Sequence, residues 1–270
     1  MGFKGSEVQI LSSRPVKTRG HLVPEKNLEV KLLSKTDNGL SLIYAAFRQC
    51  YSAGFVGDIW DDLVSGKIEK TKQAEFISRI LESGHESPIE HVSFTFAVQG
   101  VSRALTHQLV RHRIASYSQQ SQRYVDESEF DYILPPSIAR IPEAKKKFEK
   151  CMQTIGKTYR ELKTILEENG QGKKANEDAR FVLPQACESK VVFTMNCRSL
   201  FHFFELRCCE RAQWEIREMA WKMLRVLREE LPVIFSVAGP KCERLGYCPE
   251  GEKFTCGKYP TRKKIRKYKE

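Results

Sequence analysis

The sequence predicts an α+β protein in which helices flank a mixed sheet and one long helix lies toward the C-terminus. Strand-type and helix-type hydrophobic patterns follow one another without regular alternation, which favours α+β over a doubly wound parallel sheet. A helical pattern of roughly 30 residues runs from Ser199, as its N-cap, to Glu230, just before Pro232. The length of 270 residues allows one large domain or two small ones.

The first elements along the chain are a polar arm and two helices. Residues 1–27 are polar and contain two prolines, so they are expected to form an arm. Apolar residues recur at helical spacing in residues 39–53 and again in residues 71–83, which predicts a helix in each. Gly84 supplies a natural stop for the second helix.

A strand and a third helix are predicted next. Apolar and polar residues alternate over residues 91–99, as in a half-buried strand, while Pro88 excludes a helix interior just before it. Ser102 can cap a helix that extends to Val110. The polar stretch 114–124 is expected to be a loop.

The second half of the chain is expected to contain a helical hairpin arm over 141–170, a short helix over 175–183 and a strand over 190–196. From residue 239 the composition shifts to Gly, Cys, Lys and Tyr, which indicates an appendage. The predicted organisation is therefore an arm at 1–27, a main domain at 28–238 and an appendage at 239–270.

Composition excludes several classes of protein. With 41% hydrophobic and 29% charged residues the chain is typical of globular proteins rather than disordered ones. No apolar run approaches the ~20 residues that span a bilayer. No Gly-rich dinucleotide motif, phosphate-binding P-loop or serine nucleophile elbow occurs. The net charge of +11 suits an anionic ligand or partner, or equally a solvated basic surface.

Nine cysteines and no export signal indicate a reducing, cytoplasmic setting with free thiols. Cys242, Cys248 and Cys256 form a C-x5-C-x7-C pattern, which is a weak metal signal beside the alternative of local packing. His85, Glu90 and His91 could likewise hold a metal, although a polar hydrogen-bonding shell explains them better. No metal is therefore expected.

The most unusual cluster of charged and polar residues is Arg111-His112-Arg113, followed by a loop rich in Ser and Gln that ends at Arg123. Arginine forks bind phosphate bidentately, and hydroxyls complete an anion-binding shell; the alternative is a solvated basic turn. On the long predicted helix, Arg207 and Arg211 share one face. His202 lies roughly 140° from Arg207 around that helix, so the two need not serve one pocket.

The spacing R-H-R-x7-S, which ends at Ser121, resembles the signature of the flavin-dependent thymidylate synthases (ThyX). Further blocks of that family follow in the expected order over about residues 30–237. They are AAFRQCYSAG at 45–54, HESPIEHVSFTF at 85–96, RFVLP at 180–184, NCRSLFHFFELR at 196–207 and AQWEIR at 212–217.

The resemblance implies a ThyX-like homotetramer that holds FAD at subunit junctions. Such enzymes methylate dUMP to dTMP, with 5,10-methylenetetrahydrofolate as carbon donor and FAD reduced by NADPH as hydride source. It implies no cysteine nucleophile, so none of the nine cysteines needs a catalytic role. Neither a membrane nor a nucleic acid is an expected partner.

The same resemblance assigns site residues and gives Arg207 the catalytic role of favouring the ionised uracil ring. Around dUMP it places Gln108, Leu109, Val110, Arg111, Gln119, Gln120, Ser121, Gln122, Arg123, Arg180 and Arg207. Around FAD it places Ser87, Glu90, Arg111, His112, Arg113, Gln119, Asn196, Cys197, Arg198, His202 and Arg211.

The chain departs from the family pattern at a few positions. Ser118 and Gln119 stand where many members have Asn and Glu. Cys50 stands where some members have a hydroxyl residue near the FAD, and Arg211 stands where some have histidine. The alternative function is a basic nucleic-acid-binding protein that uses the C-terminal tail, where Tyr268 lies among cations.

Overall fold

The structure, a computed structural model, describes residues 27–267 of the chain. Within them, contacts divide the chain into two compact units. Unit 1 comprises residues 120–187, and unit 2 comprises residues 27–119 together with the residues from 188 onward. The predicted arm lies outside the described residues except at its last position, and the predicted domain boundaries remain predictions.

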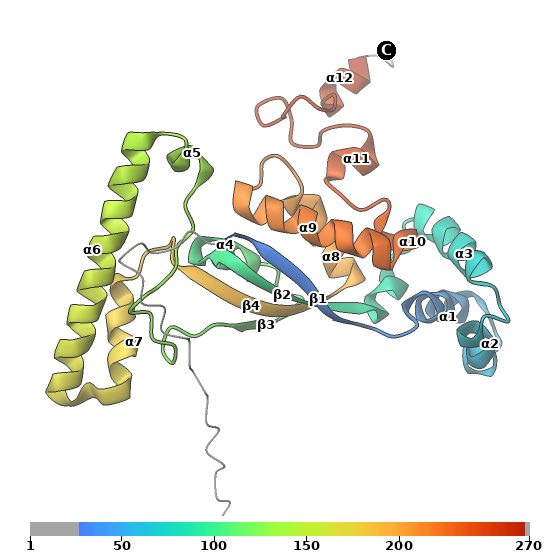
Figure 1. The fold of residues 1–270 in the computed structure, drawn as a ribbon. Helices are drawn as coiled ribbons and strands as arrows, with labels where there is room; N and C mark the ends of the chain where they lie inside the picture. Colours follow the sequence, from blue (N-terminus) through green and yellow to red (C-terminus); the bar gives the residue numbers. More distant parts are fainter. Residues whose placement is uncertain (1–26, 268–270) are drawn as a thin grey trace, which may run out of the picture. The chain divides into compact units, whose positions relative to one another are not determined.

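Unit 2 contains a four-stranded antiparallel sheet (Figure 1). Its strands are β1 (Glu29–Lys35), β2 (Ser93–Ser102), β3 (Ser116–Gln119) and β4 (Glu188–Asn196), in the spatial order β1-β2-β4-β3. Every neighbouring pair is antiparallel, so the predicted mixed sheet is wrong. Alternation of side chains is the same in parallel and antiparallel ladders, and therefore the sequence pattern could not give strand direction.

The predicted strands are confirmed with shifted ends. The strand expected over 91–99 begins two residues later and continues to Ser102, and the strand expected over 190–196 begins at Glu188. The sequence pattern missed β1, and it assigned the four residues of β3 to a loop. The short strand β3 is dominated by Ser and Gln, which carry no hydrophobic alternation.

Gly100 explains how β2 passes beyond its predicted end. The register between β2 and β4 is irregular between Val98 and Val101, and Gly100 lies there with a φ of 70°. A Cβ at this position would lie 2.0 Å from the carbonyl oxygen of Asn27. Only glycine fits both the left-handed backbone and this close approach.

The two helices predicted after the arm are confirmed. Helix α1 (Gly39–Tyr51) packs against α3 (Lys70–Glu82), and the short α2 (Trp60–Ser65) lies between them in sequence. Gly84 has a φ of 84°, as expected of the residue that ends α3.

Helix α4 (Arg103–Leu109) begins at its predicted cap. The Ser102 hydroxyl accepts a hydrogen bond from Leu105 N at 3.0 Å and donates to Glu215 Oε2 at 2.6 Å. The Ser102 backbone N–H donates to the other carboxylate oxygen of Glu215 at 2.6 Å. Both residues are buried, so this bridge fixes the start of α4 against the first turn of a later helix.

Replacing Ser102 with alanine is expected to lower the free energy of unfolding by about 2 to 4 kcal/mol, because the helix loses its cap and a buried carboxylate loses a donor. Urea unfolding monitored by circular dichroism measures the change. Ser65→Ala, which alters an exposed helical serine, is the control. Equal midpoints for the two variants would contradict the structural role of Ser102.

The single long helix predicted over 199–230 is wrong. The chain forms α8 (Cys197–Arg207) and α9 (Trp214–Glu230), separated by residues 208–213, with the short α10 (Pro232–Phe235) after them. Asn196, rather than Ser199, caps α8 and accepts from Ser199 N at 2.8 Å. Gln213 caps α9 with its side-chain oxygen. The interruption contains neither Pro nor Gly, and the apolar period continues across it, so the pattern gave no sign of the break.

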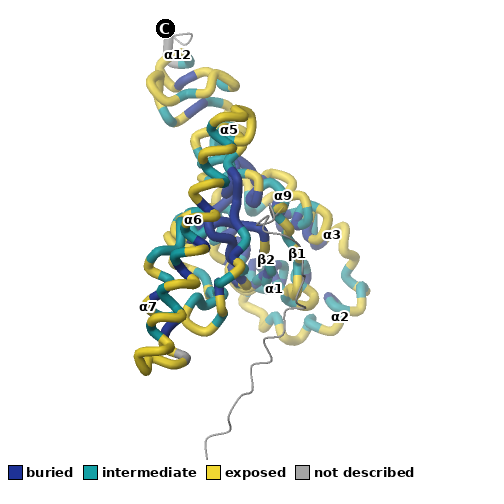
Figure 2. Tube along the Cα trace, turned by 60° about the vertical axis from the view of Figure 1, so that its left-hand side comes forward, coloured by how far each residue is buried: buried dark blue, intermediate teal, exposed yellow. Residues whose placement is uncertain are grey.

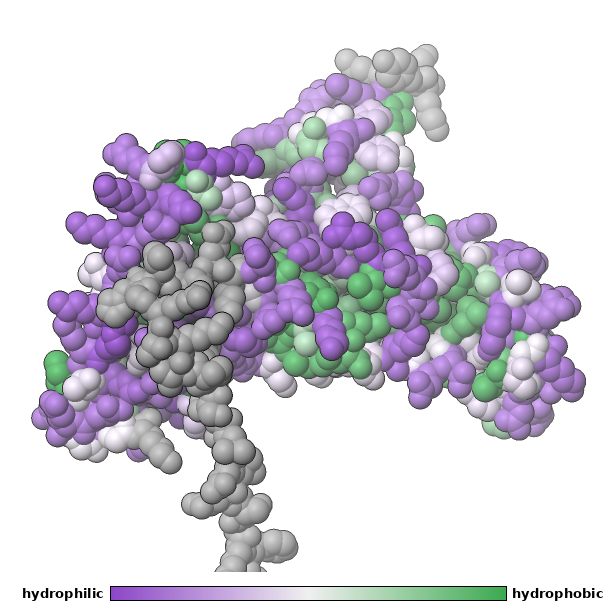
Figure 3. All heavy atoms as spheres, in the orientation of Figure 1, coloured by the Kyte–Doolittle hydropathy of each residue, from purple (hydrophilic) through white to green (hydrophobic). Residues whose placement is uncertain are grey.

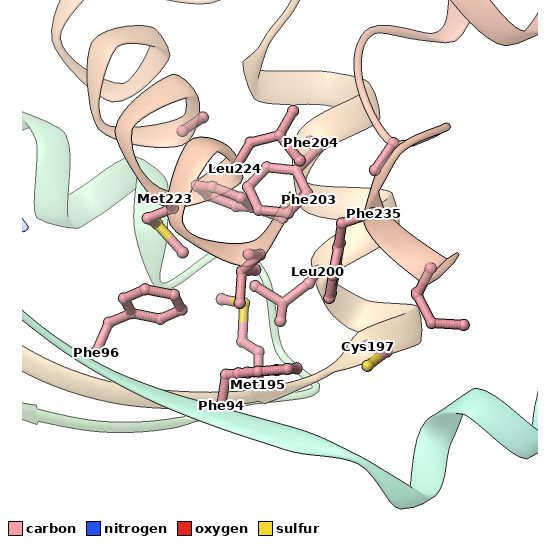
Figure 4. Packing of buried hydrophobic residues seen from close by; sticks show 14 of the residues in the cluster. Phe94, Phe96, Met195, Cys197, Leu200, Phe203, Phe204, Met223, Leu224 and Phe235 are labelled. Carbon is pink, nitrogen blue, oxygen red and sulfur yellow. The ribbon is translucent and has the colours of Figure 1, made fainter. Parts of the chain in front are cut away.

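Helices α8 and α9 cover one face of the sheet and form the core of unit 2 with it. Figure 4 shows Phe94, Phe96 and Met195 of the strands facing side chains from α8, α9 and α10. In Figure 2 the dark blue buried stretches gather at the strands and the adjoining helices. The core is rich in phenylalanine, including Phe203, Phe204 and Phe235, and fully excludes these rings from solvent.

The opposite face of the sheet retains exposed apolar side chains. Val192 of β4 is exposed, and its neighbours Val191 and Phe193 face the core. Leu33 of β1, where the register with β2 shifts, is exposed as well. Figure 3 shows apolar atoms gathered in the region of the strands.

Unit 1 has a separate small core. It contains α5 (Pro136–Ala139), α6 (Pro142–Leu166) and α7 (Ala175–Ala179), and a core cluster that includes Phe130, Tyr132 and Met152. Helices α6 and α7 pack together, which confirms the predicted helical arm and the short helix that follows it. The arm ends as expected near Gly170, which has a φ of 87°.

The C-terminal appendage belongs to unit 2 and contains α11 (Lys241–Leu245) and α12 (Arg262–Lys267). An isolated bridge joins Cys248 to Thr261, and Cys248 N donates to the carbonyl of Pro260 at 2.8 Å. Between residues 241 and 265 of the appendage, the buried residues are Cys248 and Thr261. The appendage therefore has little hydrophobic core of its own.

Candidate functional site

The turn Arg111-His112-Arg113 follows the C-terminal end of α4, where positive charge is favourable. Tyr117 of β3 holds this turn. Its hydroxyl lies 2.9 Å from the carbonyl oxygen of Leu109 and 2.7 Å from that of His112. Burial raises the pKa of Tyr117 to about 12, so the hydroxyl stays protonated. Sequence reasoning missed Tyr117, although an aromatic residue within a polar loop was an available signal.

Arg207, at the end of α8, is brought to this turn. Its Nε donates to Nε2 of His112 at 3.0 Å, and its Nη2 donates to the carbonyl oxygen of Gln108 at 3.3 Å. The guanidinium is half-buried, and burial lowers its pKa, although an arginine remains charged in proteins. The two bonds fix the guanidinium and leave further N–H groups on Nη1 and Nη2 for a ligand.

His112 is a neutral imidazole in this arrangement. Burial, with the charges of Arg207 and His202, lowers the pKa of His112 from 6.5 to about 4. Since Nε2 accepts from Arg207, the ring proton of the neutral form lies on Nδ1. At neutral pH His112 therefore orients a cation and is not itself one.

His202 lies near the same turn, with its ring centroid 6.0 Å from that of His112. His202 and Arg207 thus both approach His112 from α8. The sequence left open whether the two serve one pocket, and in unit 2 both lie beside the same histidine.

Gln119 lies at the end of β3 with its amide turned into unit 2. Its Nε2 donates to Thr106 Oγ1 at 3.0 Å and to Ser189 Oγ at 2.9 Å. Both N–H groups of the amide are thus used by protein hydroxyls. A carboxylate at this position could make these contacts only as an acceptor, so the exchange noted in the sequence changes the direction of the hydrogen bonds.

The remaining predicted cofactor residues all lie in unit 2. Arg198 pairs with Glu90, also a predicted cofactor residue, and approaches Glu86 at 4.0 Å. Arg111 and Arg113 are exposed. Leu109 of the nucleotide set and Cys197 of the cofactor set are fully buried, and nothing in the structure exposes either of them to a ligand.

Ser87 connects to a chain of polar groups on the surface of unit 2. The Ser87 hydroxyl lies 3.1 Å from His85 Nε2, and His85 Nδ1 lies 2.8 Å from the Tyr51 hydroxyl. Both ring nitrogens of His85 therefore have hydrogen-bond partners. Within residues 27–267 no group of three or more His, Cys, Asp or Glu side chains is placed to hold a metal ion.

The predicted nucleotide-binding residues of unit 1 are linked by α7. Arg123 Nη2 pairs with the Glu177 carboxylate at 3.1 Å, and Arg180 Nε donates to the Glu177 carbonyl oxygen at 3.0 Å. The Ser121 hydroxyl accepts from Arg123 N at 3.2 Å. Glu177 was not predicted, because a lone acidic residue on a short helix carries no motif. The other two predicted residues, Gln120 and Gln122, bond to Glu127 and to the Cys187 thiol.

All nine cysteines are free thiols. Burial raises the pKa of Cys208 to about 12 and that of Cys197 further, so neither is a thiolate near neutral pH.

No helix of the described residues has the length and apolar character to cross a membrane.

Comparison with known proteins gives one consistent family. Residues 31–233 match the family model described as thymidylate synthase complementing protein. The chain is 66% identical over 244 residues to a flavin-dependent thymidylate synthase of Nitratidesulfovibrio vulgaris, covering 90% of this chain and all of that relative. It is 48% identical over 247 residues to one of Clostridium tetani, with 88% and 96% covered. A third, from Geobacter sulfurreducens, is 45% identical over 233 residues, with 86% and 94% covered. These matches give no support to the nucleic-acid-binding alternative.

Proposed function

The chain belongs to the family of flavin-dependent thymidylate synthases, and from this we propose that it methylates dUMP to dTMP. The carbon donor is 5,10-methylenetetrahydrofolate, and FAD reduced by NADPH supplies the hydride. The observation that carries the proposal is the fixed guanidinium of Arg207 at the R-H-R turn, in a chain that matches the family over residues 31–233.

Arg207 supplies the electrostatic part of the reaction. Its Nε and one Nη2 N–H are held by His112 and by the Gln108 carbonyl. The remaining donors can face the uracil, where a fixed cation stabilises a ring deprotonated at N3. An anionic ring carries more electron density at C5, the carbon that is methylated. Neutral His112 holds the guanidinium without competing for the anion.

The residues of unit 2 fit a flavin dinucleotide by the chemistry of their donors. Arg111, Arg113 and Arg198 are exposed cations near a helix end, which suits a pyrophosphate. When bound, FAD supplies the electrons that convert the transferred methylene into a methyl group. The exposed side chain of His202 can hydrogen-bond to the flavin ring system, while the Asn196 side-chain oxygen is used as the cap of α8.

Unit 1 contributes to the proposal through Arg123 and Arg180. Both are tied to Glu177 within unit 1, and an arginine pair is suited to a 5′-phosphate. Their assignment to dUMP, like that of Ser121, rests on the family signature.

We also propose that the protein is a homotetramer with its sites at subunit junctions. The exposed Val192 on the uncovered sheet face, together with the exposed Leu33 of β1, supports burial against another copy. Nine free thiols fit a cytoplasmic location. Size-exclusion chromatography with light scattering measures the assembly, and a monomeric mass in the active protein would contradict it.

Purified protein supplied with FAD is expected to show a flavin absorbance spectrum that changes when dUMP is added. With NADPH and 5,10-methylenetetrahydrofolate, oxidation of the reduced flavin should depend on dUMP and should yield dTMP, which chromatography detects. The matched control omits dUMP alone. FAD-loaded protein that forms no dTMP under these conditions would refute the proposed function.

A further inference from the structure

The C-terminal appendage is fastened to the segment that joins α8 to α9. Lys258 Nζ bonds to Glu210 Oε1 at 3.1 Å. Arg244 pairs with Glu205 of α8, and Lys241 lies 3.8 Å from the same carboxylate. The Glu205 side chain is only 13% exposed. These contacts come from three points of the appendage, so they hold it against the end of α8.

Arg211 lies in that joining segment and is held on two sides. One of its Nη1 N–H groups pairs with the Glu250 carboxylate. The guanidinium carbon lies over the ring of Phe254, 4.5 Å from the ring centroid. Both partners belong to the appendage, which begins after the last residue of the family match, 233.

The two contacts restrict the guanidinium without using all of it. A free arginine side chain samples many rotamers, and a ligand that binds it must restrict them at a free-energy cost. The cation–π contact with Phe254 holds the guanidinium at the ring face, and the ion pair with Glu250 restricts its orientation there. Two contacts of this kind leave the Nε and Nη2 edge of the fork for an anionic ligand.

We propose that Glu250 and Phe254 are positioning residues that orient Arg211 toward FAD, so that the appendage beyond the family domain takes part in cofactor binding. This inference rests on the proposed function, because it takes the assignment of Arg211 to FAD from the family signature. Arg211 stands where some members have histidine. A long arginine needs more support than a histidine to hold one orientation, and the appendage provides it.

The test measures FAD affinity by flavin fluorescence in full-length variants. Glu250→Gln and Phe254→Leu are each expected to weaken FAD binding by about 3- to 10-fold, the effect of leaving one rotamer-rich side chain unordered. Glu252→Gln is the matched control, since it changes an exposed appendage carboxylate whose partner is Lys263 at 3.9 Å. Glu250→Asp should recover part of the affinity. The KM for dUMP at saturating FAD should stay unchanged.

A double-mutant cycle separates positioning from a general loss of structure. In an Arg211→Ala background, Glu250→Gln should weaken FAD binding no further, because the residue it orients is absent. Equal FAD affinity for Glu250→Gln and Glu252→Gln would overturn the inference. Tighter FAD binding by Glu250→Gln would overturn it also, since Glu250 would then compete with the cofactor. A wild-type protein that binds no FAD would instead contradict the proposed function.

Discussion

Replacing Arg207 with alanine is expected to lower turnover by about 10²- to 10³-fold, which corresponds to roughly 3 to 4 kcal/mol of transition-state stabilisation. His112 and the Gln108 carbonyl hold the guanidinium that this substitution removes, and we propose that this cation acts on the uracil ring. FAD retention should change far less. Steady-state dTMP formation and the ratio of flavin to protein absorbance measure the two effects.

Arg113→Ala is the matched comparison, because it removes an exposed cation of the same turn. Its expected effect is the reverse: FAD affinity falls by about tenfold or more, the contribution of a charge-assisted hydrogen bond. Turnover at saturating FAD should then change little. Equal and mild effects of the two substitutions would contradict the division of roles between Arg207 and Arg113.

His112→Gln is expected to remove an acid-dependent loss of activity and stability. In the wild-type protein, His112 protonates with a pKa of about 4, and its Nε2 can then no longer accept from Arg207. Turnover should therefore fall as the pH approaches 4. The introduced glutamine side chain keeps an acceptor oxygen and does not titrate. The pH dependence of kcat for wild type and variant measures the difference.

The effect on stability follows from the same pKa of His112. In the folded protein, burial and the neighbouring Arg207 and His202 lower this pKa. The unfolded chain binds a proton near pH 6.5 and the folded chain only near pH 4. Stability from neutral His112 is thus complete above about pH 6.5 and is lost as the pH falls to about 4. Urea unfolding across this range should show a smaller loss in His112→Gln. His107→Gln, an exposed histidine of α4, should behave as wild type; an identical profile for all three proteins would rule out the role of His112.

Local patterns in the sequence predicted much of the secondary structure. Helices α1, α3, α4 and α6 and strand β4 lie where hydrophobic period, caps and glycine stops indicated them. Such signals act over a few residues, because a helix or strand repeats its side-chain directions at a fixed short period. Ser102 illustrates this: its capping role is visible in sequence, because the N–H group it bonds belongs to Leu105.

The break between α8 and α9 shows where local patterns fail. An apolar period that continues across residues 208–213 predicts one helix, whereas the structure has two helices there that both pack into the core on the sheet. Strand direction fails for a similar reason. Both depend on how several elements pack together, and no window of neighbouring residues contains that information.

The candidate site divides in the same way. The sequence alone determined its residue types, since R-H-R-x7-S and the blocks around it identify the family and the ligands it binds. Only the tertiary structure decided that Arg207 meets His112 across 95 positions of chain, that Glu215 meets Ser102 across 113, and that Glu250 meets Arg211 across 39. The physical reason is that side-chain chemistry belongs to each residue, whereas the pairing of distant charges depends on the burial and packing of whole elements.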